Sequence, residues 1–150
     1  MIQKLINWKT IVIATVIVLV GLSSLQVLQT PERILDDVTV EEEGSMMILH
    51  IKTNIPLRYE NHFPEGPSNF IQIKVRAISF SGGDGSDFMG NESILPGFVE
   101  QIPIVDVAYE GSVKGGPFIS LRFKEPVNFQ IKEDPDLNGI QIYIPKNTRL

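Results

Sequence analysis

The feature that most restricts the fold of this chain is an alternation of apolar and polar residues with a period of two. Met47, Leu49 and Ile51 alternate with polar neighbours, as side chains do in a strand with one buried face. Similar runs recur at residues 38–40, 71–77, 105–109, 119–123, 127–131 and 140–144. No segment after Thr30 has helical periodicity. The chain is therefore predicted to be all-β, an antiparallel β-sandwich or open barrel of about seven strands.

The expected ends of the strands follow from charge, proline and glycine. Residues 41–45, EEEGS, predict a charged turn, and Pro126, which cannot donate a hydrogen bond to a ladder, is expected to end a strand. Residues 56–67 predict a strand that runs into a loop bounded by prolines. Residues 134–139 end in Asn-Gly, which predicts a hairpin loop.

The longest irregular segment is residues 80–103, and connections of this length are usually functional or mobile. Flexibility is expected in residues 81–91, and the apolar residues 94–99 are expected to pack back on the sandwich. Residues 82–90, GGDGSDFMG, match a calcium-binding repeat that completes its oxygen shell from tandem copies. Only one copy is present, which favours a solvated loop over a calcium site.

Residues 11–28, IVIATVIVLVGLSSLQVL, form an apolar segment behind a short basic head. A helix that crosses a bilayer core of about 30 Å needs about 20 residues, and Trp8 and Thr10 extend this segment toward that length. Lys4 and Lys9 precede it, and no acid occurs before Glu32, so the positive-inside rule places the N-terminus in the cytoplasm. We expect a single-pass inner-membrane protein whose C-terminal domain is periplasmic.

The same segment has some features of a cleaved signal peptide. Gly21-Leu22-Ser23 is a small-x-small sequence, whereas apolar residues continue to Leu28, which favours retention. The expected organisation is a cytoplasmic head with a transmembrane anchor or signal peptide (1–29), a linker (30–37), a periplasmic β-sandwich domain (38–146) and a tail (147–150).

Charge and cysteine content exclude several functions. All 18 acids but only 11 of the 13 basic residues lie after position 31, so the exported part carries about −7. That charge argues against nucleic acid as a partner, because phosphate binding needs clustered lysine and arginine. The absence of cysteine excludes disulfides, a thiolate nucleophile, a zinc-thiolate site and a lipoprotein cysteine, and it is typical of a bacterial envelope protein.

The sequence offers no catalytic set. It contains neither GxSxG nor a phosphate-binding GxxxxGK[ST] motif. The only histidines, His50 and His62, have no ligand spacing around them and are expected to be surface residues. We therefore expect no enzyme activity, no cofactor and no metal.

Cations at outward strand positions form the candidate binding surface. Lys74 and Arg76 lie on one expected central strand, and Arg122 and Lys124 lie on another. With Arg58 and Tyr59, these residues predict a surface suited to acidic groups or to carbohydrate stacked on a ring. The alternative, solvated charge that balances the acids, remains open.

Residues 117–145, PFISLRFKEPVNFQIKEDPDLNGIQIYIP, contain a strand that ends in an aromatic residue before a proline, a V-x-F-x-I strand, a loop, and an aliphatic strand that ends in proline. This pattern resembles the end of AMIN-type domains, small periplasmic β-sandwiches of cell-wall amidases and secretin subunits. Upstream, residues 56–77 and 104–111 look like membrane-anchored N-terminal modules of proteobacterial envelope proteins. The likeness covers about residues 46–146, although the closing strand lacks the usual acidic residue near its end. It implies binding of peptidoglycan or an envelope complex and carries over no catalytic residue.

These observations predict a non-catalytic, membrane-tethered periplasmic domain that binds cell-wall glycan or an envelope-assembly partner. Recognition would use the cationic strand positions or strand addition at an open edge. Two alternatives remain: a structural subunit of an inner-membrane complex with no ligand of its own, and a soluble periplasmic binding protein released by signal cleavage.

Overall fold

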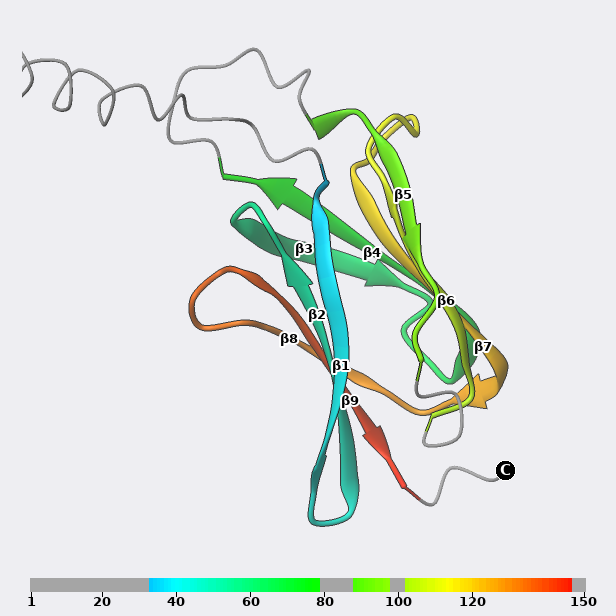
Figure 1. Ribbon diagram of the computed structural model, residues 1–150. Helices are drawn as coiled ribbons and strands as arrows, with labels where there is room; N and C mark the ends of the chain where they lie inside the picture. Colours follow the sequence, from blue (N-terminus) through cyan, green and yellow to red (C-terminus); the bar gives the residue numbers. More distant parts are fainter. Residues whose placement is uncertain (1–32, 79–87, 98–101, 147–150) are drawn as a thin grey trace, which may run out of the picture. The chain divides into compact units, whose positions relative to one another are not determined.

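The computed structural model describes residues 33–78, 88–97 and 102–146, which form two antiparallel sheets packed as a sandwich (Figure 1). The four-stranded sheet has the order β1-β2-β9-β8, with β1 at Leu35–Glu43, β2 at Met46–Thr53, β9 at Gly139–Pro145 and β8 at Gln130–Glu133. The five-stranded sheet has the order β3-β4-β7-β6-β5, with β3 at Leu57–Phe63, β4 at Ser68–Ala77, β7 at Phe118–Val127, β6 at Ile104–Glu110 and β5 at Asn91–Ile94. The predicted all-β antiparallel sandwich is confirmed.

The described residues contain nine strands rather than about seven, and the two extra strands are short. β5 occupies four residues of the segment predicted to be irregular and pairs with β6. β8 is separated from β7 at Asn128 and Phe129, where the chain crosses back to the four-stranded sheet. Residues 127–131, predicted to be one strand, therefore belong to two different sheets.

β1 is longer than predicted at both ends. It begins at Leu35, within the predicted linker, because Ile34 and Leu35 are buried in the core at 3% and 1% exposure. It continues through Glu43, so the expected charged turn is shortened to Gly44 and Ser45, with Gly44 in the left-handed region at φ +56°. The three glutamates before it pair in register with Ile48, Met47 and Met46 of β2.

Pro126 does not end β7, which continues to Val127. The register between β4 and β7 jumps from the pair Phe70–Arg122 to the pair Ser68–Val127. Pro126 lies in this irregular stretch, where the ladder needs no hydrogen bond from its nitrogen.

The core consists of the inward-facing residues of both sheets, most of them aliphatic. Among the largest side chains with less than 2% exposure are Tyr109, Leu49, Ile51, Ile71, Ile73, Ile119, Leu121 and Ile140. Each alternates with a more exposed neighbour along its strand, which is the pattern that predicted these strands. A core of this kind holds the sheets together without disulfides.

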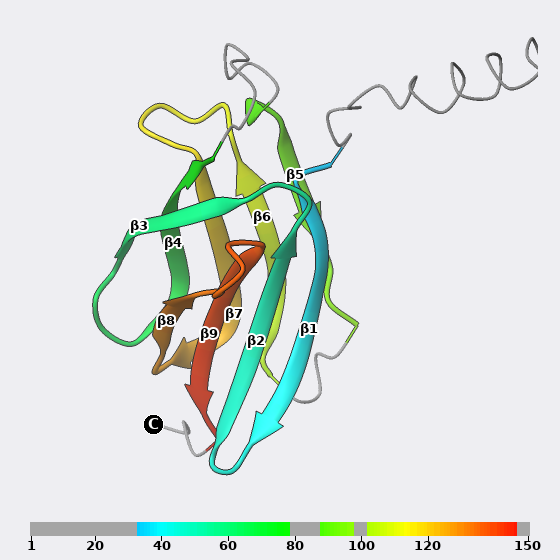
Figure 2. The ribbon, with the colours of Figure 1, turned by 90° about the vertical axis from the view of Figure 1, so that its left-hand side faces the viewer.

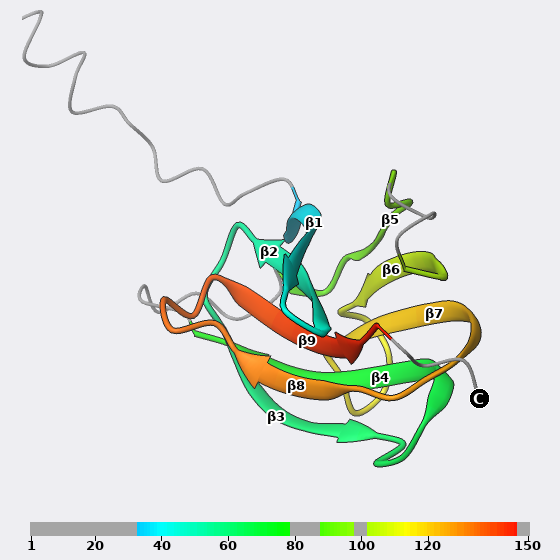
Figure 3. The ribbon, with the colours of Figure 1, turned by 90° about the horizontal axis from the view of Figure 1, so that it is seen from below.

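The two sheets also meet along their edges, as the end-on view in Figure 3 shows. β1 contacts β5 along one edge, and β3 contacts β8 along the other. We call these the β1/β5 seam and the β3/β8 seam.

The two ends of the sandwich differ in what they carry. The described chain enters at Arg33, just before Leu35, whose partner on β2 is Thr53; we call this the entry end. The turn at Gly44 and Ser45 lies at the other end, next to the end of β9 at Pro145, and we call this the far end (Figure 2). At about 3.3 Å per residue, the nine residues of β1 separate the ends by roughly 26 Å.

Some predictions concern residues outside those that the structure describes. These include the apolar segment 11–28, most of the glycine-rich motif at 82–90 and the tail at 147–150. In residues 33–78, 88–97 and 102–146 there is no helix long and apolar enough to cross a membrane.

Candidate functional site

Five of the six predicted binding residues share the outer face of the five-stranded sheet. The register of the neighbouring strands β4 and β7 pairs Lys74 with Phe118 and Arg122 with Phe70, so Lys74 and Arg76 lie toward one end of this face and Arg122 and Lys124 toward the other. Arg58 lies on β3 opposite Arg76. We call these five residues the cationic face. Tyr59 does not belong to it, because it pairs with the buried Val75 and packs against the core. The expectation that Tyr59 would offer a ring on this face is wrong.

Most of the cationic face is neutralised by acids of the same sheet. Glu60 lies at an irregularity of β3 and has no paired residue on β4. The carboxylate of Glu60 lies 3.3 Å from Arg76 Nε and 3.8 Å from Lys74 Nζ. Arg122 donates from Nε to Asp106 Oδ1 at 3.3 Å and also from Nη2 to Oδ2, and this hydrogen bonding raises the pKa of the arginine. Within the described residues, Arg58 and Lys124 are the members of the face without an ion pair.

The middle of the same outer face is closed by hydrogen bonds among three strands. Glu110 Oε2 on β6 accepts from Ser120 Oγ on β7 at 2.5 Å and from Gln72 Nε2 on β4 at 3.4 Å. Ser120 is only 4% exposed. These polar groups are satisfied within the sheet, so they are not free for a ligand.

Two phenylalanines are exposed on this face, near the β3–β4 loop. Phe63 pairs with Gln72 and is 73% exposed, and Phe70 pairs with Arg122 and is 44% exposed. Exposed aromatic rings that lie close together are typical of contact surfaces.

The two histidines are half-buried rather than surface residues, which corrects that expectation. His50 Nε2 lies 3.3 Å from Glu41 Oε2, at an angle that does not make a hydrogen bond. His62 Nδ1 lies 2.6 Å from Tyr59 Oη, and its ring meets Phe129 edge-on with centroids 5.5 Å apart. Burial raises the pKa of the Tyr59 phenol. Neither histidine makes a hydrogen bond to a serine or threonine hydroxyl in the described part of the chain, although His50 pairs across the sheet with Thr39.

A hollow of about 250 Å³ lies at the far end, where loops from both sheets meet. We call it the far-end hollow. Its apolar wall consists of Met46, Phe129, Tyr143, Pro145 and Pro67, and its polar groups come from Glu65, Asn128 and Gln130. Gln130 and Tyr143 are cross-strand partners on the outer face of the four-stranded sheet. No predicted site residue lines this hollow.

A second hollow, of about 470 Å³, lies at the entry end and is lined mainly by aspartates and asparagines. Asp134, one of its acids, accepts hydrogen bonds from the backbone of Asp136 and from Gln141 Nε2. Nowhere in the described residues do three or more His, Asp or Glu side chains form a group able to hold a metal ion.

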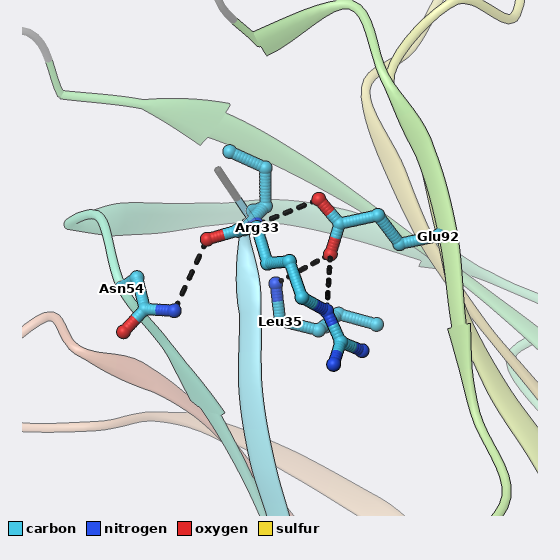
Figure 4. Close-up of polar contacts among 5 residues, drawn as sticks. Arg33, Leu35, Asn54 and Glu92 are labelled. Carbon is cyan, nitrogen blue, oxygen red and sulfur yellow. Dashed lines mark hydrogen bonds and ion pairs between the residues drawn. The ribbon is translucent and has the colours of Figure 1, made fainter. Parts of the chain in front are cut away.

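Glu92 fastens the chain to the sandwich where it enters. Figure 4 shows its carboxylate reaching from β5 to β1, where it accepts hydrogen bonds from Ile34 N at 2.7 Å and Leu35 N at 3.0 Å. Arg33 Nε lies 4.0 Å from the same carboxylate. Asn54 Nδ2 donates to Arg33 O at 3.1 Å, which adds a contact from the link after β2. The β1/β5 seam is thus held at its entry end by a carboxylate that is only 15% exposed.

The effect of Glu92 extends to the core tyrosine beside it. Glu92 pairs across the sheet with Tyr109, whose Oη donates to Phe88 O at 2.8 Å. Burial, and then the negative charge of Glu92, raise the pKa of Tyr109 to about 12.

A second glutamate bridges the β3/β8 seam. Glu133 Oε1 on β8 accepts a hydrogen bond from Tyr59 N on β3 at 3.0 Å. The contact of His62 with Phe129 lies at the same seam. Neither Glu92 nor Glu133 was singled out from the sequence, because a lone glutamate in a strand gives no sign of a partner that lies more than 50 residues away.

Comparisons of the chain with protein-family models, with curated proteins and with solved structures found no match. The likeness to AMIN-type domains rests on strand pattern and stays a prediction.

Proposed function

We propose that this chain is a non-catalytic binding module of the bacterial cell envelope. In this proposal the N-terminal segment anchors it in the inner membrane and the sandwich, an AMIN-like module, binds cell-wall glycan in the periplasm. The apolar segment behind a basic head supports the anchor, and the −7 charge of the remainder argues against nucleic acid.

The observation that carries the proposal is the position of the far-end hollow. It lies at the far end, whereas the described chain begins at Arg33 at the entry end. Concave sites lined by apolar rings and a few polar groups are the usual form of small-ligand sites. Neither described histidine makes a hydrogen bond to a serine or threonine hydroxyl, as a hydrolase triad would require, which supports binding over that kind of hydrolysis.

Sedimentation with purified, protein-free peptidoglycan sacculi tests this function. The full chain in mild detergent is expected to pellet with sacculi and to remain in the supernatant without them. Two experiments test the anchor. An anchored chain should stay in the membrane pellet after carbonate extraction, and protease added to spheroplasts should cleave its domain from outside. A chain that stays in the supernatant at every sacculus concentration would refute glycan binding.

A second candidate, an envelope-protein partner, is favoured by exposed Phe63 and Phe70 on the other sheet. Under this alternative the Phe63→Ser and Phe70→Ser variants lose co-purification of one defined envelope protein. Sedimentation of the purified chain with protein-free sacculi would be absent in that case.

A further inference from the structure

We infer that the far-end hollow is a subsite for one uncharged sugar unit of a glycan chain. This inference rests on the proposed function and names the ligand and the surface that it would use. It also moves the binding surface from the cationic face of the five-stranded sheet to the far end of the sandwich, where segments of both sheets line the hollow.

One side of the far-end hollow is an apolar wall. Phe129 and Tyr143 bring aromatic rings to the hollow, and Met46 and Pro145 add aliphatic surface. The face of a sugar ring that carries axial C–H groups is apolar and packs against such rings, while its hydroxyl groups remain at the rim. Aromatic rings provide this contact area at a low cost in conformational entropy.

The hollow also contains three polar side chains. Asn128, Gln130 and Glu65 line the hollow, and the described part of the chain offers their side chains no hydrogen-bond partner. The carboxylate accepts hydrogen bonds, and the two amides both donate and accept them. Sugar hydroxyls also donate and accept, so these groups suit a sugar. These groups are free for a ligand, unlike Glu110, Ser120 and Gln72 on the other sheet.

The charge of the lining indicates which ligand the hollow suits. The hollow has no lysine or arginine in its lining and has one carboxylate, Glu65. The ammonium of the nearby Lys132 lies 4.1 Å from the centroid of the Tyr143 ring, where it makes a cation–π contact. An anionic ligand would therefore meet a carboxylate and no free cation, so the geometry points to an uncharged unit.

The hollow is small, and one of its aromatic rings is held in place. About 250 Å³ is below the roughly 300–1,000 Å³ typical of pockets for drug-sized ligands, so the hollow holds a single ring with the rest of the glycan outside. Phe129 is held by its contact with His62, which in turn is held by Tyr59. A ring fixed before binding lowers the entropic cost of recognition.

The test uses the full chain in detergent with two probes: protein-free sacculi and soluble chitin oligosaccharides, which are uncharged β-linked N-acetylglucosamine chains. Tyr143→Ala is expected to weaken binding of both probes about tenfold or more. Gln130→Trp, at an exposed position, is expected to block the hollow without disturbing the core, and unchanged circular dichroism confirms its fold. Phe63→Ala serves as the matched aromatic control, and Arg58→Glu with Lys124→Glu serves as the charge control, each expected to change binding less than twofold.

The outcomes separate this inference from the proposed function. Loss of binding in both hollow variants with unchanged controls supports a sugar subsite. If the wild type binds sacculi and only the charge control loses binding, the hollow is not the site, while glycan binding stands. If the wild type binds neither probe, both proposals are overturned.

Discussion

The two seams of the sandwich are held together by different sets of interactions. Each must join the edge strand of one sheet to the edge strand of the other, and each uses a glutamate that accepts backbone N–H groups across the gap. At the β1/β5 seam, Glu92 takes two such bonds and its side chain is only 15% exposed. At the β3/β8 seam, Glu133 takes one, and aromatic contacts among Tyr59, His62 and Phe129 supply the rest.

The difference indicates which seam depends on a single side chain. Hydrogen bonds to a charged group contribute about 1.5–3 kcal/mol, and a buried donor left without a partner costs about 1–3 kcal/mol. Two backbone donors rely on Glu92, at the point where the chain enters the domain. The β3/β8 seam spreads its stabilisation over a hydrogen bond and several ring contacts, so no one residue there carries as much.

The largest expected effect is that of Glu92→Ala, which leaves Ile34 N and Leu35 N without an acceptor. We expect a loss of about 3 kcal/mol in the free energy of unfolding, measured by urea denaturation of residues 33–150, which form one compact unit. Glu92→Gln keeps an acceptor oxygen and is expected to lose about half as much. Glu125→Ala, on an exposed position of β7, is the matched control and is expected to change stability by less than about 0.5 kcal/mol. Equal effects of Glu92→Ala and Glu125→Ala would show that the hydrogen bonds accepted by Glu92 contribute nothing to stability.

The next effect concerns Tyr109, whose pKa is raised by burial from the usual tyrosine value of 10.0 to about 12. The folded state keeps the phenol proton at a pH where the unfolded state loses it, so this contribution is complete below pH 10 and is lost as pH rises to about 12. We expect Tyr109 to contribute a decrease of about 2–3 kcal/mol over this range, so the total decrease should be smaller by that amount in Tyr109→Phe. Glu92→Gln, which removes the nearby negative charge, should lower the pKa of Tyr109, measured by phenolate absorbance. A Tyr109 that titrates near 10 in the folded protein would contradict this account of the seam.

The sequence predicted those parts of the fold that depend on one strand at a time. The alternation in β2, β4, β7 and β9 directly reflects which side chains are buried, and those strands lie where they were expected. β5 was missed, because its four residues show too little alternation and its pairing partner β6 decides its structure. The early start of β1 was missed, because it depends on the burial of Ile34 and Leu35 in the core and on their hydrogen bonds to Glu92, on a different strand.

The candidate site was harder to predict, for the same physical reason. Alternation correctly put Lys74, Arg76, Arg122 and Lys124 on one face, yet it could not show that Glu60 and Asp106 neutralise most of it. The far-end hollow is built from Glu65–Pro67, Asn128–Gln130 and Tyr143–Pro145, three segments that only the tertiary fold brings together with Met46. Local patterns contain no information on such contacts.

A smaller effect is expected at the other seam. Glu133→Ala removes the acceptor of Tyr59 N, and we expect a loss of about 1 kcal/mol, since the aromatic contacts remain. The decisive measurement is hydrogen exchange: the Tyr59 amide should exchange faster, while Ile34 and Leu35 should not change. Glu133→Gln, which keeps an acceptor, is the control. A loss as large as that of Glu92→Ala would remove the distinction between the two seams.

The smallest expected effect is the coupling between the seams. Combining Glu92→Ala with Glu133→Ala tests it by a double-mutant cycle, with both single variants and the wild type measured in the same urea titrations. The seams lie on opposite edges of the sandwich, separated by a sheet width of roughly 15 Å, and the hydrogen bonds that Glu92 and Glu133 accept from the described backbone come from different residues. Sites this far apart add to within about 0.3–0.5 kcal/mol, so we expect a coupling energy no larger than that. A coupling above about 1 kcal/mol would mean that opening one edge already loosens the other, and the sandwich would then behave as a single closed unit rather than as two sheets fastened independently along each side.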